Sequence, residues 1–483
     1  MSLHAGRRCA WLAAVILCFP ATACAHAFGE RYDLPVPLGY FVVGAALTVA
    51  LSFVVAALFM RGSTGEGPAP GIIVPLGPVL PALRAAGRVL GVLLFFAVLA
   101  AGLFGISNPQ LNLAPVLVWI TWWVGLPLVV ACIGNVWPAL DPWRALFEWG
   151  DAAARRLGSA NGICLGLAYP AGLGAWPAVF LLLLFVWIEV IFPRAVDPPL
   201  LAAMVLAWSA VTLLGMACFG GVAWRRNADV FSLYFSMLGR FAAIAMGPDA
   251  RSIVLRPIGH GLIESAVESL AVVAFVLAML ATVLFDGLLG TQALALVHGA
   301  LTAAVPGFTD ERGYVLGAAG LIGVWLLFVG AYYLSCLVTS RLVRDRPVTA
   351  VARMFALTLI PIAIAYNIAH YFSYLVVQGQ MIIPRLSDPL GRQWDLFGTA
   401  MYYPDIGLLD ARFTWYLAIA SIVTGHVISI WLAHRLALRE FRTSRQAVIA
   451  SIPLTVLMMT YTAISLLVMA EPLVQFMQPA APS

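Results

Sequence analysis

Long apolar segments constrain this chain more than any other feature. We identify ten of them, at residues 36–60, 86–106, 114–137, 168–192, 199–223, 264–286, 315–340, 354–379, 413–434 and 447–470. As a helix, each can cross a hydrocarbon core of roughly 30 Å. Hydrophobic residues make up 62% of the 483 and charged residues only 10%, which excludes an ordinary soluble protein. We therefore predict an all-α polytopic membrane protein, with about ten transmembrane helices in a single helical-bundle domain over residues 26–483.

The N-terminus resembles a secretory signal peptide covering residues 1–25. Arg7 and Arg8 precede an apolar stretch, and small residues around Ala25 offer a cleavage site. Cleavage there predicts a mature chain that starts at His26 or Phe28. An N-terminal His26 could chelate copper through its amine and imidazole, although the simpler interpretation is that it only lies beside the cleavage site.

The arginines predict the orientation in the membrane. All 27 basic residues are arginine, and most of them lie in the loops after odd-numbered spans. By the positive-inside rule these loops are cytoplasmic, which places both mature termini in the periplasm and the protein in the bacterial inner membrane. The net charge of +5 therefore reflects topology, and we expect the lipid bilayer rather than a nucleic acid as partner.

Two loops are long enough to carry more than a turn. The cytoplasmic loop 224–263 contains the segment FSLYFSMLGRFAAIAM, which we expect to lie on the membrane surface as an amphipathic helix. The outer loop 380–412 mixes Asp and Arg residues, and it is either a lid over an outward-facing site or a solvated loop with balanced charge.

A polar stripe interrupts the apolar span 354–379. Asn367, His370, Tyr371 and Tyr374 are spaced i, i+3, i+4, i+7, so on a helix they share one face. Such a face is costly against lipid and should point into the bundle. The stripe either forms a functional pocket or supplies hydrogen bonds between helices.

Other polar residues lie at related depths. His426, near the middle of the next span, matches His370 in depth, and we expect the stripe to face it across the contact between the two spans. Glu189 and Asp286 lie at the outer ends of their spans. Glu264 and Glu268 would repel each other at i, i+4, so one of them should pair with a loop arginine or remain protonated.

Three strings of the sequence carry a resemblance to a known family. They are AHAFGERYDLPVPLGYFV from Ala25, AIAYNIAHYFSYLVVQGQ from Ala363 and SDPLGRQWDLFGTA from Ser387. The chain resembles a family of bacterial membrane proteins commonly labelled fenitrothion hydrolase. The resemblance implies hydrolysis of an organophosphorus triester, a small hydrophobic substrate.

Phosphotriester hydrolysis needs an activated water and an electrophile at the phosphoryl oxygen, and a divalent metal such as zinc or copper supplies both. The candidate imidazole ligands are His370 and His426, with Asp286, Glu189 or Glu268 as the third ligand or general base. The candidate catalytic residues are His370, His426, Asn367 and Tyr371, of which Asn367 or Tyr371 could orient the phosphoryl oxygen.

A transporter for a small solute or metal ion is the alternative interpretation. Polar residues near the middle of the membrane are typical of substrate paths, and Pro361 predicts a kink just before the stripe.

Overall fold

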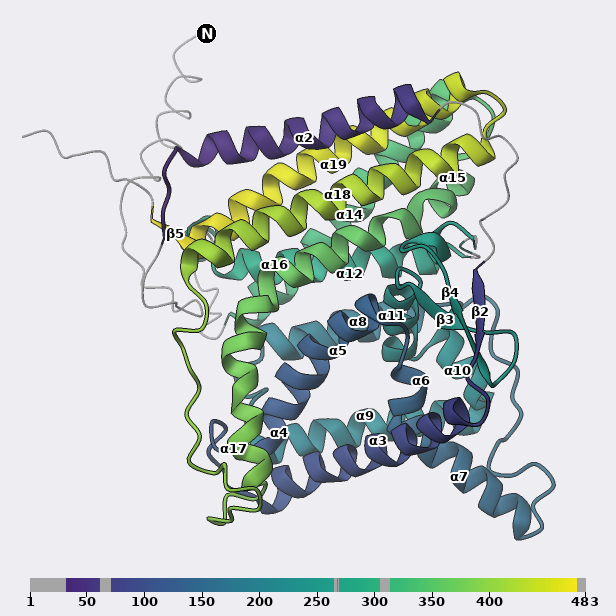
Figure 1. The fold of residues 1–483 in the computed structure, drawn as a ribbon, viewed down its shortest axis with the longest axis vertical. Helices are drawn as coiled ribbons and strands as arrows, with labels where there is room; N and C mark the ends of the chain where they lie inside the picture. The colour runs from purple at the N-terminus through teal and green to yellow at the C-terminus, as the bar shows by residue number, and fades with distance from the viewer. Residues whose placement is uncertain (1–31, 61–70, 265–266, 268, 305–312, 476–483) are drawn as a thin grey trace, which may run out of the picture.

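Helices dominate the computed structural model, which describes residues 32–60, 71–264, 267, 269–304 and 313–475 (Figure 1). Its long apolar helices confirm an all-α polytopic membrane protein. The predicted signal peptide, His26 and Glu268 lie outside the described residues.

Nine stretches of the described chain are long and apolar enough to cross a membrane. They are α2 (Leu38–Phe59), α3 (Val79–Phe104), the stretch Leu113–Cys132, α9 (Pro198–Phe219), α12 (Leu270–Leu289), α14 (Tyr314–Val343), the stretch Val348–Ser387, α18 (Ala411–Glu440) and α19 (Ser444–Leu473). Each overlaps one predicted span. The remaining prediction, 168–192, corresponds to the shorter helix α8 (Trp176–Val190).

Strand pairing shows that α8 also crosses the bundle. β1 (Tyr32–Asp33) precedes α2 and pairs in parallel with β5 (Val474–Gln475), which follows α19. Both ends of the described chain therefore lie on the same side, which requires an even number of crossings. The nine long stretches and α8 together make ten. A helix of 15 residues spans only about 22 Å, and α8 tolerates this because protein surrounds much of it.

The helices form two outer groups with a middle layer between them (Figure 1). On one side α2, α14, α18 and α19 pack together, and on the other side α3 packs against α9. The middle layer contains α8, α11 (Val230–Gly239), α12 and α16 (Ile360–Gln378). Large apolar side chains on α2, α3 and α14 remain exposed on the outer faces, as expected of surfaces covered by lipid.

The loops after odd-numbered spans meet at one end of the molecule, on the right in Figure 1, which we call the arginine-rich end. A three-stranded antiparallel sheet lies there, with the order β2 (Ile72–Pro75), β4 (Ser252–Leu255), β3 (Ile244–Met246). The short elements α6 (Trp137–Leu140), α7 (Pro142–Arg156), α10 (Gly221–Asn227) and η3 (His260–Leu262) belong to the same loops. At the opposite end, α13 (Gln292–Ala304) follows α12.

Glu264 illustrates how charges in these loops are satisfied. It precedes α12 rather than lying within it, and its carboxylate pairs with Arg256 at 3.5 Å and with His260 at 3.0 Å. This confirms that one of the two predicted glutamates pairs with a loop arginine.

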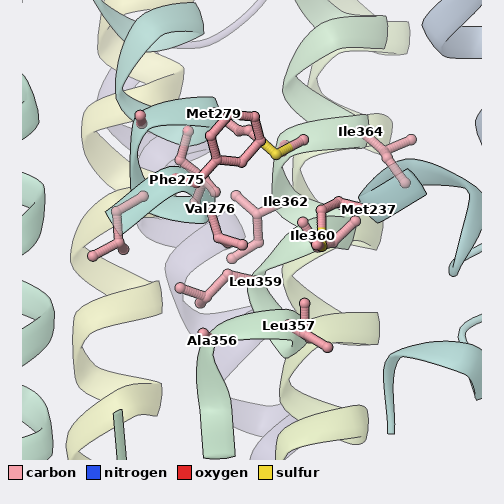
Figure 2. Packing of buried hydrophobic residues seen from close by; sticks show 14 of the residues in the cluster. Met237, Phe275, Val276, Met279, Ala356, Leu357, Leu359, Ile360, Ile362 and Ile364 are labelled. Atoms are coloured by element: carbon pink, nitrogen blue, oxygen red, sulfur yellow. The ribbon is translucent and has the colours of Figure 1, made fainter. Parts of the chain in front are cut away.

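The prediction of a surface helix in loop 224–263 is wrong. The segment forms α11, and eight of its ten residues are buried, so the helix lies inside the bundle. Figure 2 shows Met237 of α11 beside Ile360 of α16, with Phe275 and Met279 of α12 nearby. A helix that is apolar on all sides is buried rather than amphipathic, because it has no face that prefers water.

The stretch Val348–Ser387 is broken into segments, as Pro361 predicts. α15 (Val348–Phe355) leads into the 3₁₀ segment η4 (Ala356–Leu359), and α16 then begins with Pro361 in its first turn. Proline suits this position because it lacks the N–H that a helix interior needs. After η5 (Gly379–Met381) and α17 (Ile382–Ser387), loop residues 388–410 hydrogen-bond with one another and with Gln380 and Ser387.

Candidate functional site

The polar stripe of α16 meets a carboxylate from α12. His370 Nε2 lies 2.9 Å from Asp286 Oδ2, and the Tyr371 hydroxyl donates a hydrogen bond to the same oxygen at 2.5 Å. Asp286 lies one turn before the end of α12, near the end of the molecule opposite the arginine-rich end. Two helices that are far apart in sequence thus bring an acid, an imidazole and a phenol together within the bundle.

The deeper end of the stripe meets α11. Asn367 Nδ2 donates to the Tyr234 hydroxyl over 3.4 Å, and both side chains are buried. Tyr234 reaches this position only because α11 enters the bundle instead of lying on its surface.

A small cavity connects these groups with a second acid. Glu189 of α8, Asn367, Tyr371 and Tyr234 line it, and its remaining lining residues are Trp123, Val186, Thr282 and Val283. The space open to the centre of a water molecule is about 10 Å³, which holds about one water. Glu189 accepts a hydrogen bond from Trp123 and interacts electrostatically with Asp286.

Trp123 comes from an irregular helix. The span Leu113–Cys132 consists of α4 (Leu113–Pro115), a ten-residue π-helical segment η2 (Val116–Gly125) and α5 (Leu126–Cys132). Stretches of π-helix are uncommon and frequently accompany functional sites. The cavity is therefore bordered by a π-helical span, the short helices α8 and α11, and the segmented helix that contains α16.

His426 does not meet the stripe, contrary to our expectation. Its Nδ1 lies 2.8 Å from the carbonyl oxygen of Ile422 on the same helix, and its ring lies 5.7 Å from that of Tyr461. Its Nε2 is buried and has no hydrogen-bond partner in the described part of the chain.

The helix geometry explains this difference. α18 approaches α16 where Gly425 faces Pro361 and Ala365. Asn367 follows Ala365 by two residues, which is a rotation of about 200° around the helix. The stripe therefore points away from α18 and towards α12.

The four predicted metal ligands do not converge. His370 and Asp286 pair, Glu189 lies near Asp286, and His426 has separate neighbours. Among the described residues, no group of three or more His, Cys, Asp and Glu side chains could hold a metal ion.

Sequence reasoning did not identify Tyr234, Trp123 and Thr282 as lining residues. A signal for Tyr234 was present, because the segment 230–239 is apolar on every side and such helices are buried. Trp123 and Thr282 lie in apolar spans, where periodicity does not show which face meets a cavity.

The arrangement suits a proton or another small cation better than an anion. Two carboxyl groups, one imidazole and two phenols surround the cavity region, and none of the residues that line the cavity is basic. No family model matches the chain, and neither a curated protein nor a solved structure matches it.

Proposed function

We propose that this protein is a membrane transporter that moves protons, or a small solute coupled to protons, with Asp286 as the group that binds and releases the proton. The observation that carries the proposal is the shared contact of Asp286 with His370 and Tyr371 beside a water-sized cavity. Ionisable groups inside a membrane bundle are expensive and commonly mark proton or ion pathways.

The backbone around the cavity supports the same proposal. Transporter sites are commonly built from discontinuous helices, because interrupted segments can rearrange while the rest of the bundle stays packed. Here η2, α8, α11 and the segmented stretch leading to α16 all border the site.

Reconstitution into vesicles provides the direct test. A pH gradient across vesicles that contain the purified protein should dissipate faster than across empty vesicles. Asp286→Asn should reduce this rate to below about 1% of the unmodified protein, because an amide cannot take up a proton at accessible pH. Asp345→Asn, in the exposed turn between α14 and α15, is the matched control and should retain the full rate. Equal rates for Asp286→Asn and the unmodified protein would refute the proposal.

Hydrolysis of an organophosphorus triester is the second candidate, implied by the family resemblance. The Asp286–His370 pair favours it, because a carboxylate that holds one imidazole nitrogen leaves the other able to accept a proton from water. The acidic surroundings oppose it, since the transition state of this reaction accumulates negative charge. Turnover of fenitrothion by purified protein in detergent, lost in His370→Asn, would favour hydrolysis over transport.

A further inference from the structure

A second pair of buried acids lies at the arginine-rich end. Asp141 is the N-cap residue of α7, and Asp229 is the N-cap residue of α11. Their exposed fractions are only 1% and 2%. The two side chains interact electrostatically, and α10 contacts both α7 and α11, so three loop elements enclose the pair.

Each carboxyl group uses one oxygen in a local hydrogen bond. Asp141 Oδ1 accepts from the backbone N–H of Arg144 at 3.0 Å, and Asp229 Oδ2 accepts from the Ser232 hydroxyl at 2.6 Å. The other oxygens, Asp141 Oδ2 and Asp229 Oδ1, are buried and have no hydrogen-bond partner among the residues that the structure describes. Two ionised carboxylates with bare oxygens in one buried region are unfavourable, because each lacks both water and a counter-charge.

The nearby arginines pair with a different acid. Arg88, Arg144 and Arg225 approach Glu148 at 3.1, 2.7 and 3.9 Å. Within the described residues, neither Asp141 nor Asp229 forms an ion pair of its own. The guanidinium groups of Arg225 and Arg144 act on Asp141 only through their longer-range fields, which favour its ionised form, and Arg225 acts in the same way on Asp229.

Burial is the main influence on the acidity of Asp141. It raises the pKa of Asp141 to about 7, and the neighbouring Asp229 acts in the same direction. Burial also raises the pKa of Asp229, against the effect of its hydrogen bond from Ser232. Near neutral pH the pair is therefore suited to exchange a proton.

α11 links this pair to the cavity. Asp229 precedes Tyr234 by five residues, or about 7.5 Å along the helix axis. Tyr234 lines the cavity and accepts a hydrogen bond from Asn367. Phe231 and Leu233, which lie between them in the sequence, are buried and apolar.

We propose that Asp141 and Asp229 share one proton and form the proton-exchange site between the membrane cavity and the arginine-rich side. One of the two carboxyl groups carries the proton while the other is ionised, and deprotonation transfers that proton to water. The exchange role rests on the proposed transport function, whereas the shared proton does not.

Infrared spectroscopy of the full-length protein tests the shared proton directly. A protonated carboxyl group has a C=O stretching band that an ionised one lacks. In the difference between the unmodified protein and the double variant, we expect a band that disappears with a midpoint near pH 7. The band should be weaker at neutral pH in both Asp141→Asn and Asp229→Asn, because each remaining acid lacks its acidic neighbour. Asparagine is also a strong N-cap residue, so both helices should remain folded, which thermal unfolding verifies. Because Asp286 and Glu189 can contribute carboxyl bands of their own, the comparison is between the unmodified protein and the double variant. A double variant whose neutral-pH band is as strong as that of the unmodified protein would overturn the assignment.

Transport by the same variants tests the exchange role. Between about pH 6 and about pH 8, the protonated fraction of a group with a pKa near 7 changes about tenfold. The rate of the unmodified protein should follow this change, and the single variants should lose that dependence. Asp151→Asn, in the C-terminal half of α7, where Asp151 pairs with Arg155, is the control and should keep it. An unchanged pH profile in the single variants would overturn the exchange role. A titrating band in a protein that shows no transport would support the shared proton and refute the proposed function.

Discussion

His370 and His426 lie in consecutive, antiparallel spans at similar expected depths, yet their environments differ. His370 is half-buried and pairs with Asp286 from α12, next to a phenol and a cavity. His426 is fully buried, contacts the carbonyl group of Ile422 in its own helix and has a ring nitrogen without a partner. Similar depth in the membrane therefore does not imply a similar environment. The difference lies in which neighbouring helix each side chain faces.

The same contrast separates the two sides of α16. The side facing α18 carries small residues and permits close backbone approach, whereas the side facing α12 and α11 carries the polar stripe. One helix thus packs closely against a neighbour on one side and presents polar groups to its neighbours on the other. Mutations on the two sides should separate stability from activity.

The largest expected effect comes from His370. Asn at this position cannot accept and release a proton, so we expect His370→Asn to reduce proton transport at least about tenfold. Expression and thermal unfolding should change little, because the side chain is only half-buried. Vesicle transport and detergent thermal unfolding, measured on the same preparation, check both statements. A full transport rate in this variant would show that His370, like His426, is not needed for transport.

The second effect concerns the packed side of α16. A β-carbon at Gly425 would clash with Ala365 and lie 2.8 Å from the carbonyl oxygen of Pro361. Gly425→Ala should therefore lower the free energy of unfolding by about 1–3 kcal/mol, because overpacking forces the helices apart. Gly323→Ala on α14 is the control, since nothing lies within 4 Å of its β-carbon. Equal unfolding temperatures for the two variants would show that α16 and α18 are less closely packed here.

A smaller effect is expected at the deep end of the stripe. Tyr234→Phe removes the hydroxyl group that accepts a hydrogen bond from Asn367, leaving a buried amide donor unsatisfied. The bond is long, so we expect a cost near the low end of the usual range, about 1 kcal/mol, and a transport rate reduced about fivefold. Tyr169→Phe removes a hydroxyl group that bonds Gly174 outside the cavity, and it should leave transport unchanged. Similar transport rates for the two variants would show that α11 does not contribute to the site.

The sequence predicted the parts of this arrangement that depend on one segment at a time. Hydropathy located the spans, the 3.6-residue period located the stripe, and Pro361 located the helix break. It did not predict that Asp286 rather than His426 faces the stripe, because periodicity within a helix does not say which neighbour each face meets. Similarly, the apolar character of α11 on every side favours burial, but it does not say which helices surround it.

The smallest effect should come from His426, which makes it the counterpart of His370. Leu has a similar volume, and it would remove a buried nitrogen, Nε2, that has no hydrogen-bond partner. The lost contact with Ile422 is local to α18, whose backbone hydrogen bonds remain. We therefore expect His426→Leu to change the free energy of unfolding by less than about 1.5 kcal/mol and to leave transport within about twofold of the unmodified protein. A loss of transport as large as that of His370→Asn, with unfolding unaffected, would show that the two histidines act together despite their separate neighbours.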